Sequence, residues 1–333
     1  MSRTAIVILN HNGEKLLPQF LPSVVQYSNT AEIIVADNAS TDQSIPFLRK
    51  EYPAIRLILL DQNYGFCGGY NRALSQVDAD YFVLLNSDVE VTEGWLDPMI
   101  ELLDNDERIA AVQPKILSYT NRNKFEHAGA GGGLIDSLGY PFCRGRIFDQ
   151  VESDNGQYDD VTEIFWATGA CMIIRAEAFR RFDGFDDDFF AHMEEIDLCW
   201  KIHRVGQKVC YYGKSTVYHV GAGTLEYGNP RKVFLNFRNG LSMVYKHWSR
   251  WELMYKLPTR VALDWVAAAA YLVKGQPQSC GAVFRAHYRF LRNLGGDRKK
   301  RQKIQKTPRY NGATIIRGLI LVDHYLFGKK GFP

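Results

Sequence analysis

Short runs of aliphatic residues alternate with amphipathic stretches over the first 120 residues of the chain. Each aliphatic run is five or six residues long and is typical of a buried strand. The stretches between the runs space their apolar residues as helices do, so the alternation predicts a mostly parallel sheet flanked by helices. The expected strands are 5–9, 32–36, 55–60 and 81–85, and the expected helices are 14–28, 42–52 and 66–77.

Polar, acidic or glycine-rich residues follow all four expected strands. Ligands of open parallel sheets bind at the carboxyl ends of the strands. Packing alone would require such a turn once or twice, so the repetition indicates a binding or catalytic site at this edge. The four segments are NHNG (10–13), DNASTD (37–42), DQNYGFCGGYN (61–71) and NSDVEV (86–91).

The pattern changes further along the chain. Residues 121–162 are rich in Gly, Asn and Asp, which is typical of a long loop. Residues 162–179 indicate a strand followed by the start of a helix, and residues 208–224 resemble two short strands that end at His219. From about residue 229 onwards, long helix-like stretches carry many Arg, Lys and aromatic residues.

The charge distribution divides the chain at the same place. Residues 1–228 carry 19 Lys and Arg against 33 Asp and Glu, a net charge of −14, whereas residues 229–333 carry 21 against 4, a net charge of +17. We therefore expect a catalytic domain over 1–228 and a basic helical region over 229–333. The basic region suits an anionic partner, either phospholipid or nucleic acid, although solvated helices packed on the first domain explain it equally well.

Neither a membrane span nor a disulfide framework is expected. The apolar run at 261–275 is too short to cross a bilayer and contains Asp264. The six cysteines include no CxxC pair and several lie in apolar runs, which favours free thiols in a reducing compartment. The opening MSRTAIVILN has no cleavage-site pattern, so no signal peptide is expected.

Three carboxylates stand among apolar residues in FFAHMEEIDLCWKI (189–202). The dipole of a helix stabilises acids in its first turn, so these residues have a purely structural explanation. If the segment is helical, however, Glu195 heads an apolar stripe. Desolvation there would raise its pKa towards the range of a general base. The stripe continues through Leu198, Cys199 and Ile202, and the neighbouring face carries Glu194, Asp197 and Lys201.

Side chains at the expected strand ends suit a nucleotide and a metal ion. Asp37 can accept a hydrogen bond from the imide N–H of uracil or thymine, although its segment equally suits a helix cap. Gly65 and Gly68 permit a close backbone approach at a helix start, which suits a diphosphate; a plain tight turn is the alternative. Asp88 can bind a divalent cation, with His219 as a further ligand.

Taken together, the motifs resemble those of the inverting family 2 glycosyltransferases of the GT-A fold, particularly bacterial rhamnosyltransferase-like members. The resemblance covers roughly residues 4–240, and the motifs stand in the family's order. They are VILNHNG, VADNASTD, NYGFCGGYNRAL, LLNSDVEV, WATGACMIIR, GFDDDFFAHMEEIDLCWKI and VYHVGAGT.

The resemblance implies roles for the matching residues. Asp37 would bind the nucleotide base, Asp88 and His219 would hold Mg²⁺ or Mn²⁺, and Glu195 would be the catalytic base. The remaining expected site residues are Glu194 and Asp197 beside the base, Trp166, Thr168 and Gly169 at the donor or acceptor pocket, and Asn10, Asn12, Asn38, Asn63, Gly65, Gly68, Asn71, Asn86 and Ser87 around the nucleotide.

Two positions depart from the family's pattern. The metal motif reads Asn86-Ser87-Asp88, so an amide replaces its first carboxylate. The usual Glu-Asp pair reads Glu194-Glu195, which is one methylene longer at the base and leaves the choice between the two glutamates open.

The implied reaction moves a sugar from a UDP- or dTDP-linked donor to a hydroxyl group of a glycan or lipid-linked saccharide, as in the synthesis of cell-surface polysaccharides. A carboxylate takes the proton of the hydroxyl as it attacks the anomeric carbon, and the nucleoside diphosphate leaves from the opposite face. The single displacement inverts the anomeric configuration. We expect a cytoplasmic protein, docked on the inner face of the membrane if the basic region binds anionic lipid, and no nucleic acid partner.

Three other functions compete with this interpretation. A nucleotidyltransferase would share the sheet and the metal-binding acid, but it would carry a glycine-rich loop with a basic end where this chain has NHNGEKLL. A nucleic-acid-binding protein would use the basic region and leave the acidic first part unexplained. A relative that binds sugar nucleotides without catalysis would differ from an enzyme in its response to replacement of Glu195.

Overall fold

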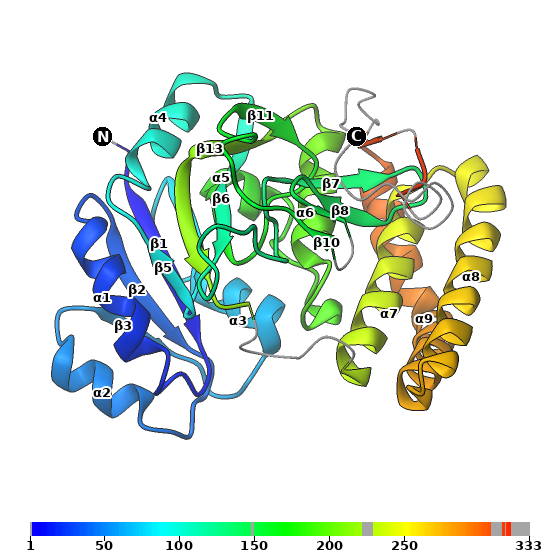
Figure 1. Cartoon of the computed structure of the whole chain (residues 1–333), viewed down its shortest axis with the longest axis horizontal. Coiled ribbons are helices and arrows are strands. Elements are labelled where there is room, and N and C mark those ends of the chain that lie inside the picture. Colours follow the sequence, from blue (N-terminus) through cyan, green and yellow to red (C-terminus); the bar gives the residue numbers. More distant parts are fainter. Residues whose placement is uncertain (1, 148–149, 222–228, 308–314, 317, 321–333) are drawn as a thin grey trace.

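The first part of the central sheet is parallel, as the sequence predicts (Figure 1). The computed structural model of the chain describes residues 2–147, 150–221, 229–307, 315–316 and 318–320. Four parallel strands lie in the order β3-β2-β1-β4, and the expected strands and helices of this part are confirmed. Their bounds are β1 Thr4–Asn10, α1 Leu17–Tyr27, β2 Glu32–Asp37, α2 Ser44–Glu51, β3 Arg56–Leu59, α3 Gly65–Leu74 and β4 Tyr81–Asn86.

Both faces of this sheet are covered, which explains why its strands read as unbroken apolar runs. In β1, Ala5 and Val7 pack into one apolar layer, whereas Ile6 and Ile8 pack into the other. All four side chains are at most 2% exposed. Because neither face of the sheet is in contact with solvent, the polar residues of these segments are confined to the strand ends.

The second part of the sheet mixes parallel and antiparallel pairs. Strand β12 runs antiparallel to both β4 and β6, while β13 runs parallel to β6. The whole sheet has nine strands. Its α/β architecture agrees with the prediction. The prediction of two short strands before His219 is wrong, because β13 is one strand whose register shifts between Tyr212 and Thr216. The bounds are β5 Val89–Val91, α4 Asp97–Asn105, β6 Ile109–Ser118, β11 Val161–Ile164, β12 Cys171–Arg175, α5 Ala176–Arg181, α6 Glu194–Arg204 and β13 Lys208–His219.

A second, five-stranded sheet occupies the segment predicted to be a loop. Its strands have two to four residues each, which is too short for any apolar period to show in a glycine-rich sequence. One of its strands, β14, lies far along the chain from the others and pairs with β7, where Ile315 lies opposite Ile135. The bounds are β7 Gly133–Asp136, β8 Pro141–Cys143, β9 Arg146–Ile147, β10 Gln150–Val151 and β14 Ile315–Ile316.

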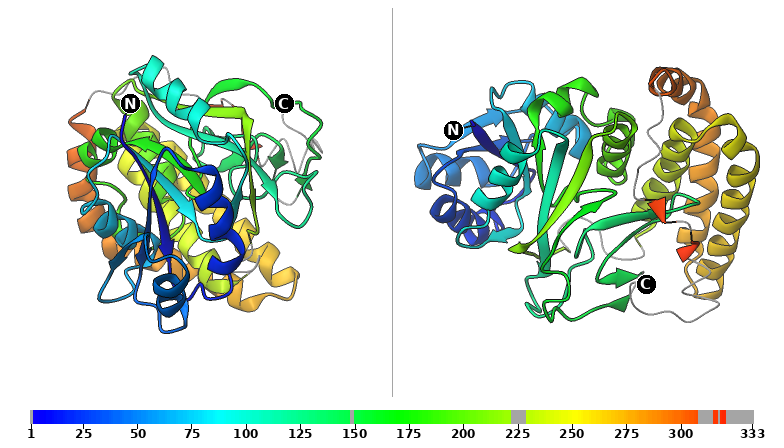
Figure 2. Two further views of the ribbon diagram at one scale, coloured as in Figure 1. Left: turned by 90° about the vertical axis from the view of Figure 1, so that its left-hand side faces the viewer. Right: turned by 90° about the horizontal axis from the view of Figure 1, so that it is seen from above.

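Three long helices form the basic region, as predicted: α7 Pro230–His247, α8 Arg250–Val273 and α9 Pro277–Gln305 (Figure 2). Helix α7 lies between the sheet domain and the α8–α9 pair. Gln305 and Arg204 both donate hydrogen bonds to the carbonyl of His247, which ties the end of α9 and the end of α6 to the end of α7. The predicted domain boundary at 228 lies outside the described residues and stays a prediction. None of the described helices is both long and apolar enough to cross a membrane.

Candidate active site

Asp88, Glu126 and His219 meet beyond the carboxyl end of β4. Asp88 lies in the turn between β4 and β5, and β5 pairs with the end of β13, where His219 lies opposite Val89. His219 Nε2 lies 3.1 Å from Asp88 Oδ1, and His219 Nδ1 lies 3.1 Å from Glu126 Oε2. The two residues that the sequence assigns to a metal are therefore in contact, and Glu126 is an addition that the sequence did not reveal.

The histidine is held between two buried carboxylates. Burial alone would lower the pKa of His219, but its hydrogen bonds to Asp88 and Glu126 raise that pKa to about 10. Burial tends to raise the pKa of Glu126, and His219 outweighs this effect and lowers it. A carboxylate on one ring nitrogen orients the other nitrogen, as is usual for metal-binding histidines. In the part of the chain that the structure describes, no group of three or more His, Cys, Asp or Glu side chains is arranged to hold a metal ion.

Asp37 ends β2 as a buried carboxylate that already has three hydrogen-bond donors. Its oxygens accept from the Asn10 side chain at 2.9 Å, the Ser40 hydroxyl at 2.6 Å and the Ser40 amide at 2.9 Å. The Oδ1 atom of Asn10 is buried and has no partner among the described residues. Asn12 is exposed and accepts a hydrogen bond from the Thr41 amide. These contacts preorganise the edge where β1 and β2 end.

The start of α3 is covered by the chain itself, and the diphosphate site expected there stays a prediction. The amides of Phe66 and Cys67 donate to the carbonyl of Phe190 at 2.8 and 3.1 Å. Gly65, with φ of 71°, lies against the Phe190 ring, where an added Cβ would come within 2.7 Å. The amides just before them are occupied as well, since Tyr64 donates to Asn38 and Gly65 to Asn63. The amides of residues 64–67 at this helix start are therefore paired within the chain.

Two further residues expected around the nucleotide make contacts within the chain. Asn71 uses both ends of its amide on the backbone of Phe185, and it also donates to Asp187. Gly68 permits close contact with Tyr64 and Arg72 of the same chain. Asn86 and Ser87 are half-buried at the end of β4, and Asn86 Nδ2 lies 3.4 Å from His219 Nε2.

The segment expected to face the donor or acceptor is largely buried. The Trp166 indole N–H donates to the Leu134 carbonyl at 2.8 Å, and the side chain is 5% exposed. Thr168 is bound through its amide to Gln113, and Gly169 lies close to the Phe66 ring. Trp166 and Thr168 are thus buried, and their expected place at the donor sugar or the acceptor entrance stays a prediction.

The backbone turns sharply before α6. Phe190, His192 and Met193 have φ values of 64°, 70° and 72°, a region that residues other than glycine rarely adopt and that is often found at functional sites. Asn239 of α7 donates to the carbonyls of Phe189, Ala191 and His192 and so holds this turn in place.

Glu194 and Glu195 begin α6 immediately after this turn. Burial raises the pKa of Glu195 to about 7, while burial and the charge of Glu195 raise the pKa of Glu194 well above its usual value. One oxygen of each carboxyl is buried and has no hydrogen-bond partner among the described residues. Leu198, Cys199 and Ile202 of the stripe are buried as expected, but Glu195 at its head is half-buried, whereas Glu194 is only 4% exposed. Exposure therefore ranks the two glutamates in the order opposite to the one that the helical period suggested.

Asp197 differs from both glutamates because basic side chains lie within ion-pair distance of both of its oxygens. Its carboxylate lies 3.0 Å from Lys201, 2.8 Å from Lys246 and 3.1 Å from His247. Burial would raise its pKa, but Lys201 and Lys246 hold that pKa far below its usual value. Lys246 also binds Asp186 at 2.6 Å. Asp197 is thus a buried ion-pair centre that joins α6 to α7, and its expected place beside the base stays a prediction.

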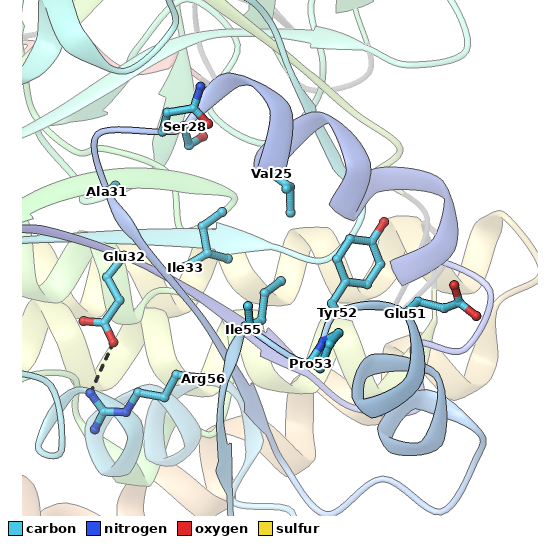
Figure 3. A pocket seen from close by; sticks show the side chains of 12 residues that line it. Val25, Ser28, Ala31, Glu32, Ile33, Glu51, Tyr52, Pro53, Ile55 and Arg56 are labelled. Atoms are coloured by element: carbon cyan, nitrogen blue, oxygen red, sulfur yellow. Dashed lines mark hydrogen bonds and ion pairs between the residues drawn. The ribbon is translucent and has the colours of Figure 1, made fainter.

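The hollow in Figure 3 lies at the opposite end of the strands, where β2 begins. It has a volume of about 480 Å³ and is lined by the end of α1, the start of β2 and residues 51–56. Glu32 and Arg56 pair beside it at 3.5 Å. Since Glu32 begins β2 and Asp37 ends it, this hollow is not part of the candidate site.

The fold and the residues at the strand ends define a glycosyltransferase. The family model for glycosyl transferase family 2 matches residues 5–182, which is more than half of the chain. The chain therefore belongs to glycosyl transferase family 2, and the nucleotidyltransferase and nucleic-acid-binding interpretations lose their basis. The match ends before α6 and β13, so the roles expected for Glu195 and His219 stay predictions.

The similar proteins include rhamnosyltransferases. The N-acetylglucosaminyl-diphospho-decaprenol L-rhamnosyltransferase of Mycobacterium tuberculosis is 25% identical over 231 residues, which cover 64% of this chain and 75% of that protein. The rhamnosyltransferase WbbL of Escherichia coli is 23% identical over 62% of this chain and 79% of its own length. The chain is thus a rhamnosyltransferase-like member of its family.

Solved structures share the fold at low sequence identity. The mannosyltransferase PcManGT from Pyrobaculum calidifontis, in complex with GDP-mannose and Mn²⁺, aligns with a TM-score of 0.54 and 17% identity over 87% of each chain. GalNAc-T7 with UDP, GalNAc and Mn²⁺ aligns with a TM-score of 0.59 and 15% identity over 76% of this chain and 49% of that chain. The GT-A fold expected from the sequence is confirmed.

Proposed function

We propose that this chain transfers a sugar from a UDP- or dTDP-linked donor to a hydroxyl group of a glycan or lipid-linked saccharide, with inversion of the anomeric configuration. The observation that carries the proposal is the pair of desolvated carboxyls, Glu194 and Glu195, each with an unpaired buried oxygen. The decaprenol-linked substrate in the name of the mycobacterial relative supports a lipid-linked acceptor. The free thiols of all six cysteines agree with the cytoplasmic location that we propose. No nucleic acid partner is proposed.

Glu195 is the proposed base. The acceptor hydroxyl would donate a hydrogen bond to the unpaired Oε2, and its proton would pass to this carboxylate as the oxygen attacks the anomeric carbon. The bond from the anomeric carbon to the phosphate oxygen breaks as the new bond forms. One displacement needs one base, and burial together with the charge of Glu195 raises the pKa of Glu194, which favours the neutral form of that carboxyl. NMR of the first product formed would show the inverted anomer, whereas a retained anomer would contradict single displacement.

The pH dependence of transfer tests the base. The pKa of Glu195 is raised to about 7, so the ionised base is lost as the pH falls below 7. We expect log(kcat/KM) to rise with a slope near one below pH 7 and to level off above it, with the two carboxyls titrating as a pair. A profile that is flat between pH 5 and 8 would contradict this assignment.

A divalent cation, Mg²⁺ or Mn²⁺, would supply positive charge for the leaving diphosphate. Asp88 and Nε2 of His219 would hold it after the proton between them has left, and Glu126 would orient the imidazole. A buried carboxylate and an imidazole that face one another fit such an ion, and two protein ligands suffice for a cation that keeps waters and binds phosphates. The Mn²⁺ in the two similar structures supports this proposal.

Replacing Glu126 by Gln is expected to weaken Mn²⁺ binding by about 10- to 100-fold, because the imidazole loses the carboxylate that orients it. Isothermal titration of the protein with Mn²⁺ and a nucleoside diphosphate measures the affinity directly. Glu90→Gln is the matched control, since Glu90 lies on the neighbouring strand β5 and pairs with Arg122. Equal Mn²⁺ affinity of the Glu126 variant and the control would contradict the role of Glu126.

The donor is identified by thermal stability. Nucleoside diphosphate sugars are screened with Mg²⁺ or Mn²⁺, and the true donor raises the melting temperature because it binds the folded state only. A shift with UDP- or dTDP-linked sugars supports the proposal. Stabilisation by none of the donors tested would count against it.

A further inference from the structure

Helix α8 turns apolar residues outward and charged residues inward. Every exposed residue between positions 251 and 273 is uncharged and most are apolar, with Trp251 76% and Val273 89% exposed. A surface helix of a water-soluble domain shows the reverse arrangement. The charged residues of this stretch, all half-buried or buried, are Glu252, Lys256, Arg260 and Asp264.

The inward charges fix the orientation of α8. Asp264 accepts from Arg260 at 3.2 Å, from His287 of α9 at 3.1 Å and from the Tyr140 hydroxyl at 3.2 Å. Arg260 also donates to the Leu138 carbonyl at 3.0 Å. These buried contacts would be lost if α8 rotated about its axis. They therefore hold the apolar face of α8 in contact with solvent, although the ion pair of Arg260 and Asp264 is desolvated.

Helix α9 adds arginines to the same side of the molecule. Helices α8 and α9 pack together at the end of the molecule farthest from β1, β2 and β3 (Figures 1 and 2). The exposed apolar residues of α9 are Phe284, Tyr288 and Leu291, and each has an exposed arginine next to it in the sequence, at 285, 289 and 292. Along both helices no Asp or Glu is exposed, because Glu252, Asp264 and Asp297 are half-buried or buried.

We propose that the outward face of α8 and α9 docks on an anionic phospholipid bilayer. Trp251, Tyr255 and Trp265 would enter the interfacial layer with their aliphatic neighbours, while the arginines of α9 would bind lipid phosphates. A second copy of the chain suits this face less well, because it would bring together two surfaces whose exposed charges are all positive. The face is independent of the catalytic residues, so this proposal and the proposed function fail separately.

Flotation of the full chain with vesicles tests the docking. We expect binding to vesicles of phosphatidylcholine mixed with phosphatidylglycerol, weaker binding to phosphatidylcholine alone, and a decrease with salt. Arg285→Gln with Arg289→Gln should weaken binding by about fivefold per arginine, and Trp251→Ser with Val273→Ser by about tenfold or more. The controls, expected to leave binding unchanged, replace exposed residues elsewhere: Arg49→Gln with Lys50→Gln, and Leu59→Ser with Val161→Ser.

Tryptophan fluorescence locates the contact. Of the six tryptophans, Trp251 and Trp265 are exposed whereas Trp95, Trp166, Trp200 and Trp248 are buried, so brominated lipid should quench only the two on α8. Absence of binding to the anionic vesicles overturns the proposal, as does binding that the α8 and α9 variants do not weaken. Sedimentation that shows a dimer which Trp251→Ser with Val273→Ser dissociates would also overturn it in favour of a second copy.

Discussion

Replacing Glu195 by Gln is expected to lower kcat for sugar transfer by a factor of about 10² to 10⁴, the usual contribution of a positioned general base. Glutamine keeps the size of the side chain but cannot take the proton of the acceptor hydroxyl. Donor affinity and the melting temperature should be retained, because the carboxyl of Glu195 has an unpaired buried oxygen rather than an ion-pair partner. Initial rates with saturating donor and acceptor measure the effect.

Glu194→Gln is the matched control, since it removes a neighbouring carboxyl of similar desolvation. We expect it to retain kcat within about tenfold, because Glu194 is protonated when Glu195 is ionised. The opposite ranking of the two variants would make Glu194 the base. Donor binding without transfer by the unaltered chain would show instead a relative that binds sugar nucleotides but does not react.

Replacing Asp197 by Asn is expected to destabilise the fold by about 3–5 kcal/mol, because it leaves the buried ammonium of Lys246 with half of its negative partners. Lys246 is 1% exposed, and Asp197 and Asp186 together keep its pKa above the usual value despite burial. The carboxylate also binds Lys201 and His247, so its loss loosens the contact of α6 with α7. Urea unfolding followed by circular dichroism measures the change.

Asp78→Asn is the surface control for this experiment. Asp78 pairs with Arg3 at 2.7 Å, but the two side chains are 80% and 62% exposed, so we expect almost no change in the free energy of unfolding. A loss at position 197 no larger than that at position 78 would show that the buried network contributes nothing. Asp197→Leu combined with Lys246→Met should recover part of the stability, because the buried ammonium is removed together with its partner and Asp186 keeps its ion pair with Lys300.

Long apolar runs were the most reliable part of the prediction. The first four strands follow from the apolar runs, since strands of a sheet that is covered on both faces must be apolar along their whole length. The three helices follow from the helical spacing of apolar residues between these runs. The five-stranded sheet was missed because its strands are too short to show a period and β14 lies far along the chain from its partner β7.

Partners of polar side chains were the least predictable part. Gly65 and the amides after it have the features of an anion site, and only the fold shows that the Phe190 carbonyl takes that place. Trp166 and Thr168 stand in a motif that suggests a pocket, yet β7 and Gln113 cover them. Glu126 carries no signal of its own in the sequence, because its importance arises from contact with His219.

The sequence by itself determined the α/β sheet, the positions of the strand ends that carry Asp37 and Asp88, and the basic helices after residue 229. Each of these follows from local periods and composition, which a short window of the chain contains. The tertiary structure decided which polar groups meet. It separated Asp197, paired with Lys246, from Glu194 and Glu195, and it turned the apolar face of α8 outward. Burial and pairing depend on residues distant in the chain, and it is desolvation, not residue type, that sets their pKa values and their chemistry.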